Sequence, residues 1–140
     1  MTFPFATTLT AGVILILQIL LAAMTSGARG STKNPIGDGG NDAMIRAIRR
    51  HGNLAENAGI FIAGLMLLEL SKFSPTLLTI LCIAFVVVRL VHAIGLSQEN
   101  TNNAFRFLGG VGTYLIGLVL GGTLIWIGAM AYTAARATGG

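Results

Sequence analysis

Apolar residues fall in four long runs along the chain, and short polar stretches separate these runs. The first run lies within residues 2–28 and the last within residues 107–135, and neither contains a charged residue. A run of about 20 apolar residues is long enough to cross a bilayer as a helix. We therefore predict that both runs are transmembrane. Because basic residues follow the first run rather than precede it, we interpret it as an uncleaved helix instead of a signal peptide.

The two middle runs also have recognisable boundaries. Asn57–Leu68 is too short to span a bilayer, so this helix must begin upstream, near Asp42, with its first part at the membrane interface. Ser74 and Pro75 are typical of an N-cap followed by the first helical residue. Short connections make consecutive helices antiparallel. The sequence thus predicts one domain over residues 1–140, with helices over about 6–28, 42–71, 75–97 and 104–135.

The composition agrees with a membrane protein. Apolar residues make up 54% of the 140 residues and charged residues only 10%, well below the ~25% usual in soluble domains. The predicted fold class is all-α, an integral membrane antiparallel four-helix bundle. One cysteine excludes an internal disulfide framework, and two histidines leave few ligands for a metal ion. No metal site is expected.

Basic residues are divided unevenly between the two ends of the predicted bundle. Of the 9 Lys and Arg residues, only Lys72 and Arg136 belong to the end opposite the first and third connections. Because Lys and Arg are enriched in cytoplasmic loops, both termini are predicted to face away from the cytosol. The net charge of +4 then reflects topology and a polar pocket, and no nucleic-acid partner is expected. The short chain and loops favour a bacterial inner membrane.

Polar residues form a stripe along the second predicted helix. At 100° per residue from Asp42, this stripe occupies a sector of about 80° and contains Arg46, Arg49, Asn53 and Glu56. Snorkelling at the interface accounts for basic residues near a helix end, but it does not account for Asn53 and Glu56. The stripe is therefore predicted to face the bundle interior or a water-filled pocket.

A second stripe follows the third predicted helix, with residues three or four positions apart: Cys82, Phe85, Arg89, His92 and Leu96. Arg89 and His92 lie deep in the bundle on this stripe. Arg89 is open to two interpretations, a contact to a ligand or an ion pair with Glu56 that serves packing alone. Cys82 is predicted to be a core residue rather than a nucleophile, because no nearby cation would activate its thiol.

The fourth predicted helix begins close to Arg106, and this arginine is the strongest candidate for a catalytic residue because it can reach both the loops and the bundle interior. One face of the same helix carries glycines that are predicted to allow close helix contact in lipid: Gly110, Gly117, Gly121 and Gly128. Elsewhere, Gln18 is predicted to form an interhelical hydrogen bond, and Glu69 an i,i+3 pair with Lys72.

The inventory of candidate side chains suits a small zwitterionic anion. Arginine forks bind carboxylates, and a glutamate suits an ammonium group. Glutathione, which has two carboxylates, one ammonium and one thiol, matches this inventory. An arginine near its sulfur would favour the thiolate, which is the nucleophilic form. The membrane would then deliver a lipophilic electrophile to the site.

Three segments, Gly37–Asn57, Arg89–Ser97 and Asn103–Arg106, resemble the MAPEG family, the membrane-associated proteins in eicosanoid and glutathione metabolism. The most specific part is the pattern R-x-x-R-x-x-x-N-x-x-E over residues 46–56, and the hydropathy agrees over essentially the whole chain. The resemblance implies a homotrimer of four-helix chains, with glutathione bound between neighbouring subunits near the cytosolic face.

The resemblance also implies roles for individual residues. Glutathione-contacting positions correspond to Arg49, Asn53, Glu56 and His92, and Arg106 corresponds to the arginine that stabilises the thiolate. Arg29 is similar to an arginine that closes the pocket. Arg46 and Arg89 belong to the two polar stripes, and we expect them to bind glutathione as well. The loops are similar to those of bacterial members. Because Gly52, Leu96 and Phe107 differ from residues of the family's eicosanoid enzymes, the resemblance implies thiol binding without specifying the reaction.

The leading hypothesis is a glutathione-dependent transferase or peroxidase that acts on lipophilic electrophiles. Two alternatives stay open at this point. A small multidrug-type transporter would need an ionisable carboxylate well inside the bilayer, where the first helix offers only Gln18. A non-catalytic membrane scaffold would use the polar stripes only to neutralise one another.

Overall fold

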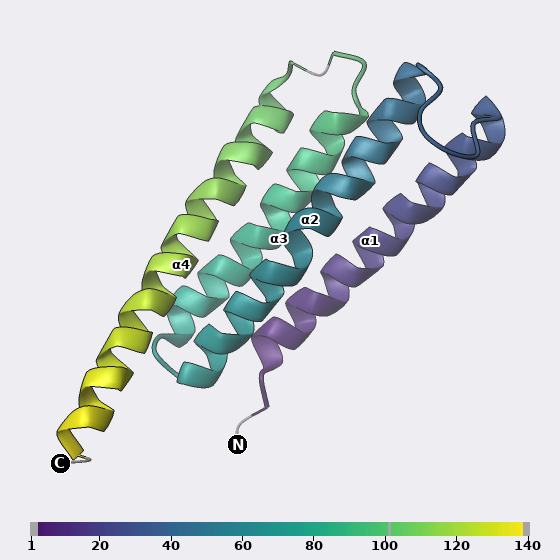
Figure 1. The fold of residues 1–140 in the computed structure, drawn as a ribbon. Coiled ribbons are helices and arrows are strands. Elements are labelled where there is room, and N and C mark those ends of the chain that lie inside the picture. The colour runs from purple at the N-terminus through teal and green to yellow at the C-terminus, as the bar shows by residue number, and fades with distance from the viewer. Residues whose placement is uncertain (1–2, 101, 139–140) are drawn as a thin grey trace.

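The computed structural model describes residues 3–100 and 102–138. These residues form an antiparallel bundle of four helices: α1 (Phe5–Thr32), α2 (Asp42–Ser71), α3 (Pro75–Ser97) and α4 (Ala104–Thr138) (Figure 1). The fold is all-α, as predicted, and each helix is long and apolar enough to cross a membrane. The bounds of α2 and α3 coincide with the expected ranges, whereas α1 and α4 end later than expected.

Side-chain caps define where the helices begin. The Ser74 hydroxyl accepts a hydrogen bond from the amide of Leu77 at 3.3 Å, and Pro75 follows it as the first helical residue. The side chain of Asn41 likewise accepts from the amide of Met44 at 3.1 Å, at the start of α2. Each cap satisfies an amide that has no acceptor within its own helix.

All four helices contribute to the core, and most of its buried residues belong to α2 and α3. The rings of Phe61 and Phe85 stack with their centroids 4.5 Å apart, and Cys82 belongs to the same buried cluster, as predicted. Most other large apolar side chains point outward, which suits a surface solvated by lipid. The prediction for Gln18 is wrong within this chain, because its buried Oε1 has no hydrogen-bond partner among the described residues.

Glycines set the short distance between α3 and α4. A Cβ atom at Gly109 would lie 2.6 Å from the Cα atom of His92. A Cβ atom at Gly95 would lie 2.7 Å from the Cα atom of Arg106. Neither separation is sterically possible, and both involve backbone atoms that a rotamer change cannot move. The two helices can therefore pack this closely only because both positions are glycine.

The glycine face predicted for α4 accounts for only part of the packing. A Cβ atom at Gly117 would contact the ring of Phe61 at 3.2 Å, so this position does face a neighbouring helix. A Cβ atom at Gly121 or Gly128 would have no atom within 4 Å, and the prediction of close contact is wrong for these two positions within one chain. The closest approach to α3 instead lies about 100° around α4, on the side of Gly109.

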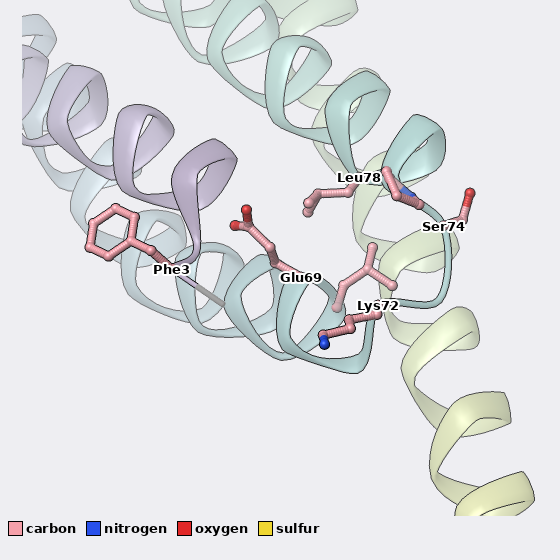
Figure 2. Close-up of a pocket in the computed structure, with 7 residues that line it drawn as sticks. Phe3, Glu69, Lys72, Ser74 and Leu78 are labelled. Carbon is pink, nitrogen blue, oxygen red and sulfur yellow. The ribbon is translucent and has the colours of Figure 1, made fainter. Parts of the chain in front are cut away.

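The carboxylate of Glu69, on α2, holds the start of α1. Its Oε1 accepts from the amide of Ala6 at 3.0 Å and its Oε2 from the amide of Thr7 at 2.8 Å. Figure 2 shows Glu69 turned toward α1 while Lys72 points elsewhere. The predicted pair of Glu69 with Lys72 is therefore wrong. The first amides of a helix have no acceptor of their own and carry the positive end of its dipole, so they attract the carboxylate.

We expect Glu69→Gln to destabilise the protein by roughly 1.5 to 3 kcal/mol, because it replaces two charge-assisted hydrogen bonds with at most one neutral bond. The thermal unfolding midpoint in detergent, followed by circular dichroism, would measure the effect. Lys72→Gln serves as the matched control and should leave the midpoint nearly unchanged. Equal midpoints for the two variants would contradict the assignment.

The fourth helix is longer than a bilayer requires. Its 35 residues extend over about 52 Å, whereas the hydrocarbon core is about 30 Å thick. The ring of Trp126 meets that of Phe73, in the α2–α3 connection, with the centroids 5.0 Å apart. Beyond this contact, α4 continues past the end of the bundle (Figure 1).

Candidate functional site

A groove lies at the end of the bundle that holds the α1–α2 and α3–α4 connections. Its volume is about 1030 Å³, slightly above the range of about 300 to 1,000 Å³ typical of small-molecule sites. Its walls come from the first half of α2, the end of α3 and the beginning of α4. It is lined by Ile45, Arg46, Ile48, Arg49, Gly52, Asn53, Glu56, His92, Leu96, Asn102, Asn103, Arg106, Phe107, Gly110, Val111 and Tyr114.

The groove brings together most of the residues that the sequence singles out. Those that line it are Arg46, Arg49, Asn53, Glu56, His92 and Arg106. The four on α2 are three or four residues apart, so successive helical turns present them to the same side. Three arginines and one glutamate make the groove positively charged. Arg29 and Arg89 do not line it.

The backbone of Arg106 is held against α3 from both sides. Its amide donates to Oδ1 of Asn103 at 2.9 Å, and Nδ2 of Asn103 donates to the carbonyl of Gly95 at 2.8 Å. Its carbonyl accepts from Nδ1 of His92 at 3.2 Å. Because a carbonyl oxygen can only accept, Nδ1 of His92 must carry a proton. His92 therefore fixes the start of α4, and the exposed side chain of Arg106 extends from a fixed backbone.

Arg89 lies behind the groove rather than in its wall. Its side chain is only 3% exposed, and its guanidinium donates to Oγ1 of Thr113 at 3.0 Å and to both oxygens of Asn53. The ion pair with Glu56, one of the two interpretations of the sequence, does not form. Arg89 is not among the residues that line the groove, whereas Asn53, which it contacts, is one of them.

Arg29 holds the connection between α1 and α2. Its Nη1 donates to the carbonyls of Pro35 at 3.2 Å, Gly37 at 3.1 Å and Asn34 at 3.4 Å. These three hydrogen bonds from one nitrogen hold the connection against the end of α1. Within one chain it does not reach the groove between α2 and α4, so the expected closure of the pocket is not a contact of this single chain.

The apolar half of the groove is the part of the site that the sequence does not predict. Phe107, Val111 and Tyr114 of α4 line it, and all three are exposed at the surface of the chain. They lie four and three residues apart, so successive turns of α4 present them on one face. This spacing is visible in the sequence. It does not identify the groove face, because α4 is apolar on all sides. Gly52 and Leu96 also line the groove.

A smaller hollow of about 360 Å³ lies at the opposite end of the bundle, between the starts of α1 and α3 and the end of α2 (Figure 2). Its polar groups serve the fold, since both oxygens of Glu69 bind amides of α1 and the hydroxyl of Ser74 caps α3. Among the residues that the structure describes, no group of three or more His, Cys, Asp or Glu side chains could hold a metal ion. The larger groove is the candidate site.

Comparison with known proteins gives one result. The family model described as the MAPEG family matches residues 5–126, which include α1, α2, α3 and α4 as far as Trp126. No curated protein matches the chain. All of the residues that line the large groove fall inside the matched range.

Proposed function

The chain belongs to the MAPEG family, and from this premise and the geometry of the groove we propose that it is a glutathione-dependent transferase or peroxidase acting on lipophilic electrophiles. It is an integral membrane protein whose apolar surface contacts the lipid bilayer. The observation that carries the proposal is the groove itself, which joins a charged wall on α2 to an apolar wall on α4, with Arg106 at the start of α4.

The charged wall suits the tripeptide. Arg46 and Arg49 supply guanidinium forks for its two carboxylates, and Glu56 supplies a partner for its ammonium group. The apolar wall, with Phe107 and Tyr114, suits a hydrophobic second substrate that arrives from the bilayer. A ligand with both chemistries would span the groove from α2 to α4.

Arg106 is the residue we assign to catalysis. A guanidinium near the thiol favours the thiolate by opposite-charge attraction, and the proton leaves to water, to which this part of the groove is open. In a transferase reaction the thiolate forms a sulfur–carbon bond as the bond to the leaving group breaks. In a peroxidase reaction it takes one oxygen of the hydroperoxide as the O–O bond breaks and the alcohol leaves, and a second glutathione then gives the disulfide and water.

The assembly and its location are further parts of the proposal. We expect a bacterial-type member that forms a homotrimer in the inner membrane, with the groove end at the cytosol and the termini on the other side. The excess of Lys and Arg at the groove end supports this orientation.

The direct test is whether glutathione stabilises the purified protein. A ligand that binds only the folded state, at about 100 times its Kd, adds roughly 2.7 kcal/mol to the free energy of unfolding. We therefore expect glutathione to raise the Tm in detergent by several degrees, and Arg49→Ala to remove most of this shift. Arg136→Ala, at the far end of α4, is the matched control and should keep it. An unchanged Tm for the unmodified chain would contradict the proposal and favour a non-catalytic scaffold.

A further inference from the structure

Arg89 is a buried cation without a counter-ion among the described residues. Its side chain is 3% exposed, and every hydrogen bond that it makes goes to a neutral group on α2 or α4. Its Nε atom is also buried without a partner. A charge in this position is costly unless an anion lies close by, because the surrounding protein and lipid screen it poorly. The arrangement raises the question of which anion compensates it.

The contact with Arg89 determines how Asn53 faces the groove. A guanidinium has only donors, so the side-chain atom of Asn53 that it contacts must be the oxygen, Oδ1. The backbone carbonyl of Asn53 is also occupied, because it accepts from Arg89 and from Nδ2 of Asn57 at 2.8 Å. The group that Asn53 retains for the groove is therefore its NH₂, which is a pair of donors.

Thr113 fixes Arg89 from the opposite side. Its hydroxyl donates to the carbonyl of Gly109 at 2.7 Å, so its oxygen is oriented to accept from Nη1 of Arg89 at 3.0 Å. The chain of contacts runs from α4 through Arg89 on α3 to Asn53 on α2. It joins the three helices that form the groove, and of its three residues only Asn53 lines the groove.

We propose that Arg89 is a positioning residue that holds the Asn53 amide with its NH₂ toward the groove, so that this part of the site takes an anionic acceptor such as a carboxylate. The inference rests on the proposed function and assigns a polarity to one part of the same site. Asn53 donates to the bound carboxylate, and the buried charge of Arg89 attracts the same anion from behind. A cationic or donor group at this position is disfavoured by both residues.

The decisive variant is Asn53→Asp, which is nearly isosteric. The aspartate supplies Arg89 with a counter-ion and leaves no donor toward the groove. We expect the Tm of the ligand-free protein to rise and the affinity for glutathione, measured by calorimetry in detergent, to fall by about tenfold or more. A variant that is more stable yet binds more weakly cannot be explained by damage to the fold. Retained affinity for glutathione would overturn the inference.

A matched pair of threonines tests the positioning role. Thr113 and Thr123 lie on the same helix, and each hydroxyl donates to the carbonyl four residues earlier at 2.7 Å. Only Thr113 contacts Arg89. We expect Thr113→Val to raise the KM for glutathione by roughly threefold to tenfold, with kcat nearly unchanged, and Thr123→Val to change neither. Equal KM values for the two variants would overturn the role of Arg89.

The two proposals can fail separately. An unmodified chain that does not bind glutathione overturns the proposed function. In that case the Tm of ligand-free Asn53→Asp still decides the inference, because the need of Arg89 for an anion does not depend on which ligand supplies it. A Tm at or below that of the unmodified chain overturns the inference. A higher Tm supports it.

Discussion

Replacing Arg106 by alanine is expected to lower glutathione-dependent turnover by a factor of about 10² to 10³, the usual cost of removing one group that stabilises developing negative charge. The backbone at Arg106 is held by Asn103 and His92 rather than by its own side chain, so the fold should survive the change. Conjugation of an aromatic halide and reduction of a lipid hydroperoxide would measure the loss. Titration of glutathione would separate kcat from KM.

Two further variants complete the Arg106 experiment. Arg136→Ala removes an arginine from the same helix, outside the groove, and should retain full activity. Arg106→Lys keeps the positive charge but loses the planar fork, so we expect intermediate turnover. Equal turnover in the alanine variant and the unmodified protein would show that the thiolate is stabilised elsewhere. The Tm of each variant serves as the control for folding.

The largest effect on stability is expected for Gly95→Ala. The new Cβ atom would lie 2.7 Å from the Cα atom of Arg106, so α3 and α4 would have to move apart. Overpacking of this kind costs about 1 to 3 kcal/mol and occasionally more, and here the obstacle is backbone that cannot rotate away. We expect a lower Tm together with reduced activity, because the same movement displaces Arg106 from the groove.

The matched control for Gly95 is Gly121, which lies in a helix but has open space around it. A Cβ atom there would have no atom within 4 Å in this chain. Gly121→Ala should therefore leave the Tm unchanged, or raise it through the higher helix propensity of alanine, by at most about 1 kcal/mol. If Gly95→Ala and Gly121→Ala unfold at the same temperature, the close contact between α3 and α4 is not needed for stability.

Much of the fold could be predicted from the sequence because the relevant signals are local. Apolar length decides that four helices form, and the capping pair Ser74 and Pro75 places the start of α3. Lys33 caps the end of α1 in the left-handed conformation, with φ of 55°, where glycine is the usual residue. The end of the apolar run therefore predicts an end of α1 several residues before Thr32, where the helix ends.

The candidate site could be predicted where one helix supplies several of its residues. The spacing of Arg46, Arg49, Asn53 and Glu56 places them on one face whatever the rest of the chain does. The partner of Arg89 could not be predicted in this way. Whether it contacts Glu56, a ligand or Asn53 depends on the rotation of α2 against α3, and this rotation brings the oxygens of Asn53 to the guanidinium.

Packing partners could not be predicted either, because they also depend on how the helices are placed against one another. Both Gly109 and Gly121 are compatible with a helix contact, and only the crossing of α3 over α4 decides that Gly109 is the one used. The spacing of three residues predicts a pair of Glu69 with Lys72, but two amides at the start of α1, 62 and 63 residues away in sequence, are the donors that Glu69 binds. A local rule cannot rank a neighbour in sequence against one brought close by folding.

The length of α4 also bears on how deep the groove lies in the bilayer. Beyond Trp126 the helix continues for about 18 Å and carries Arg136 packed over the ring of Tyr132, at 5.4 Å. Aromatic and basic side chains prefer the headgroup layer, so this pair resists vertical sliding of the helix through the lipid. Because α4 is a single rigid rod, an anchor in one leaflet fixes the height of Arg106 in the other.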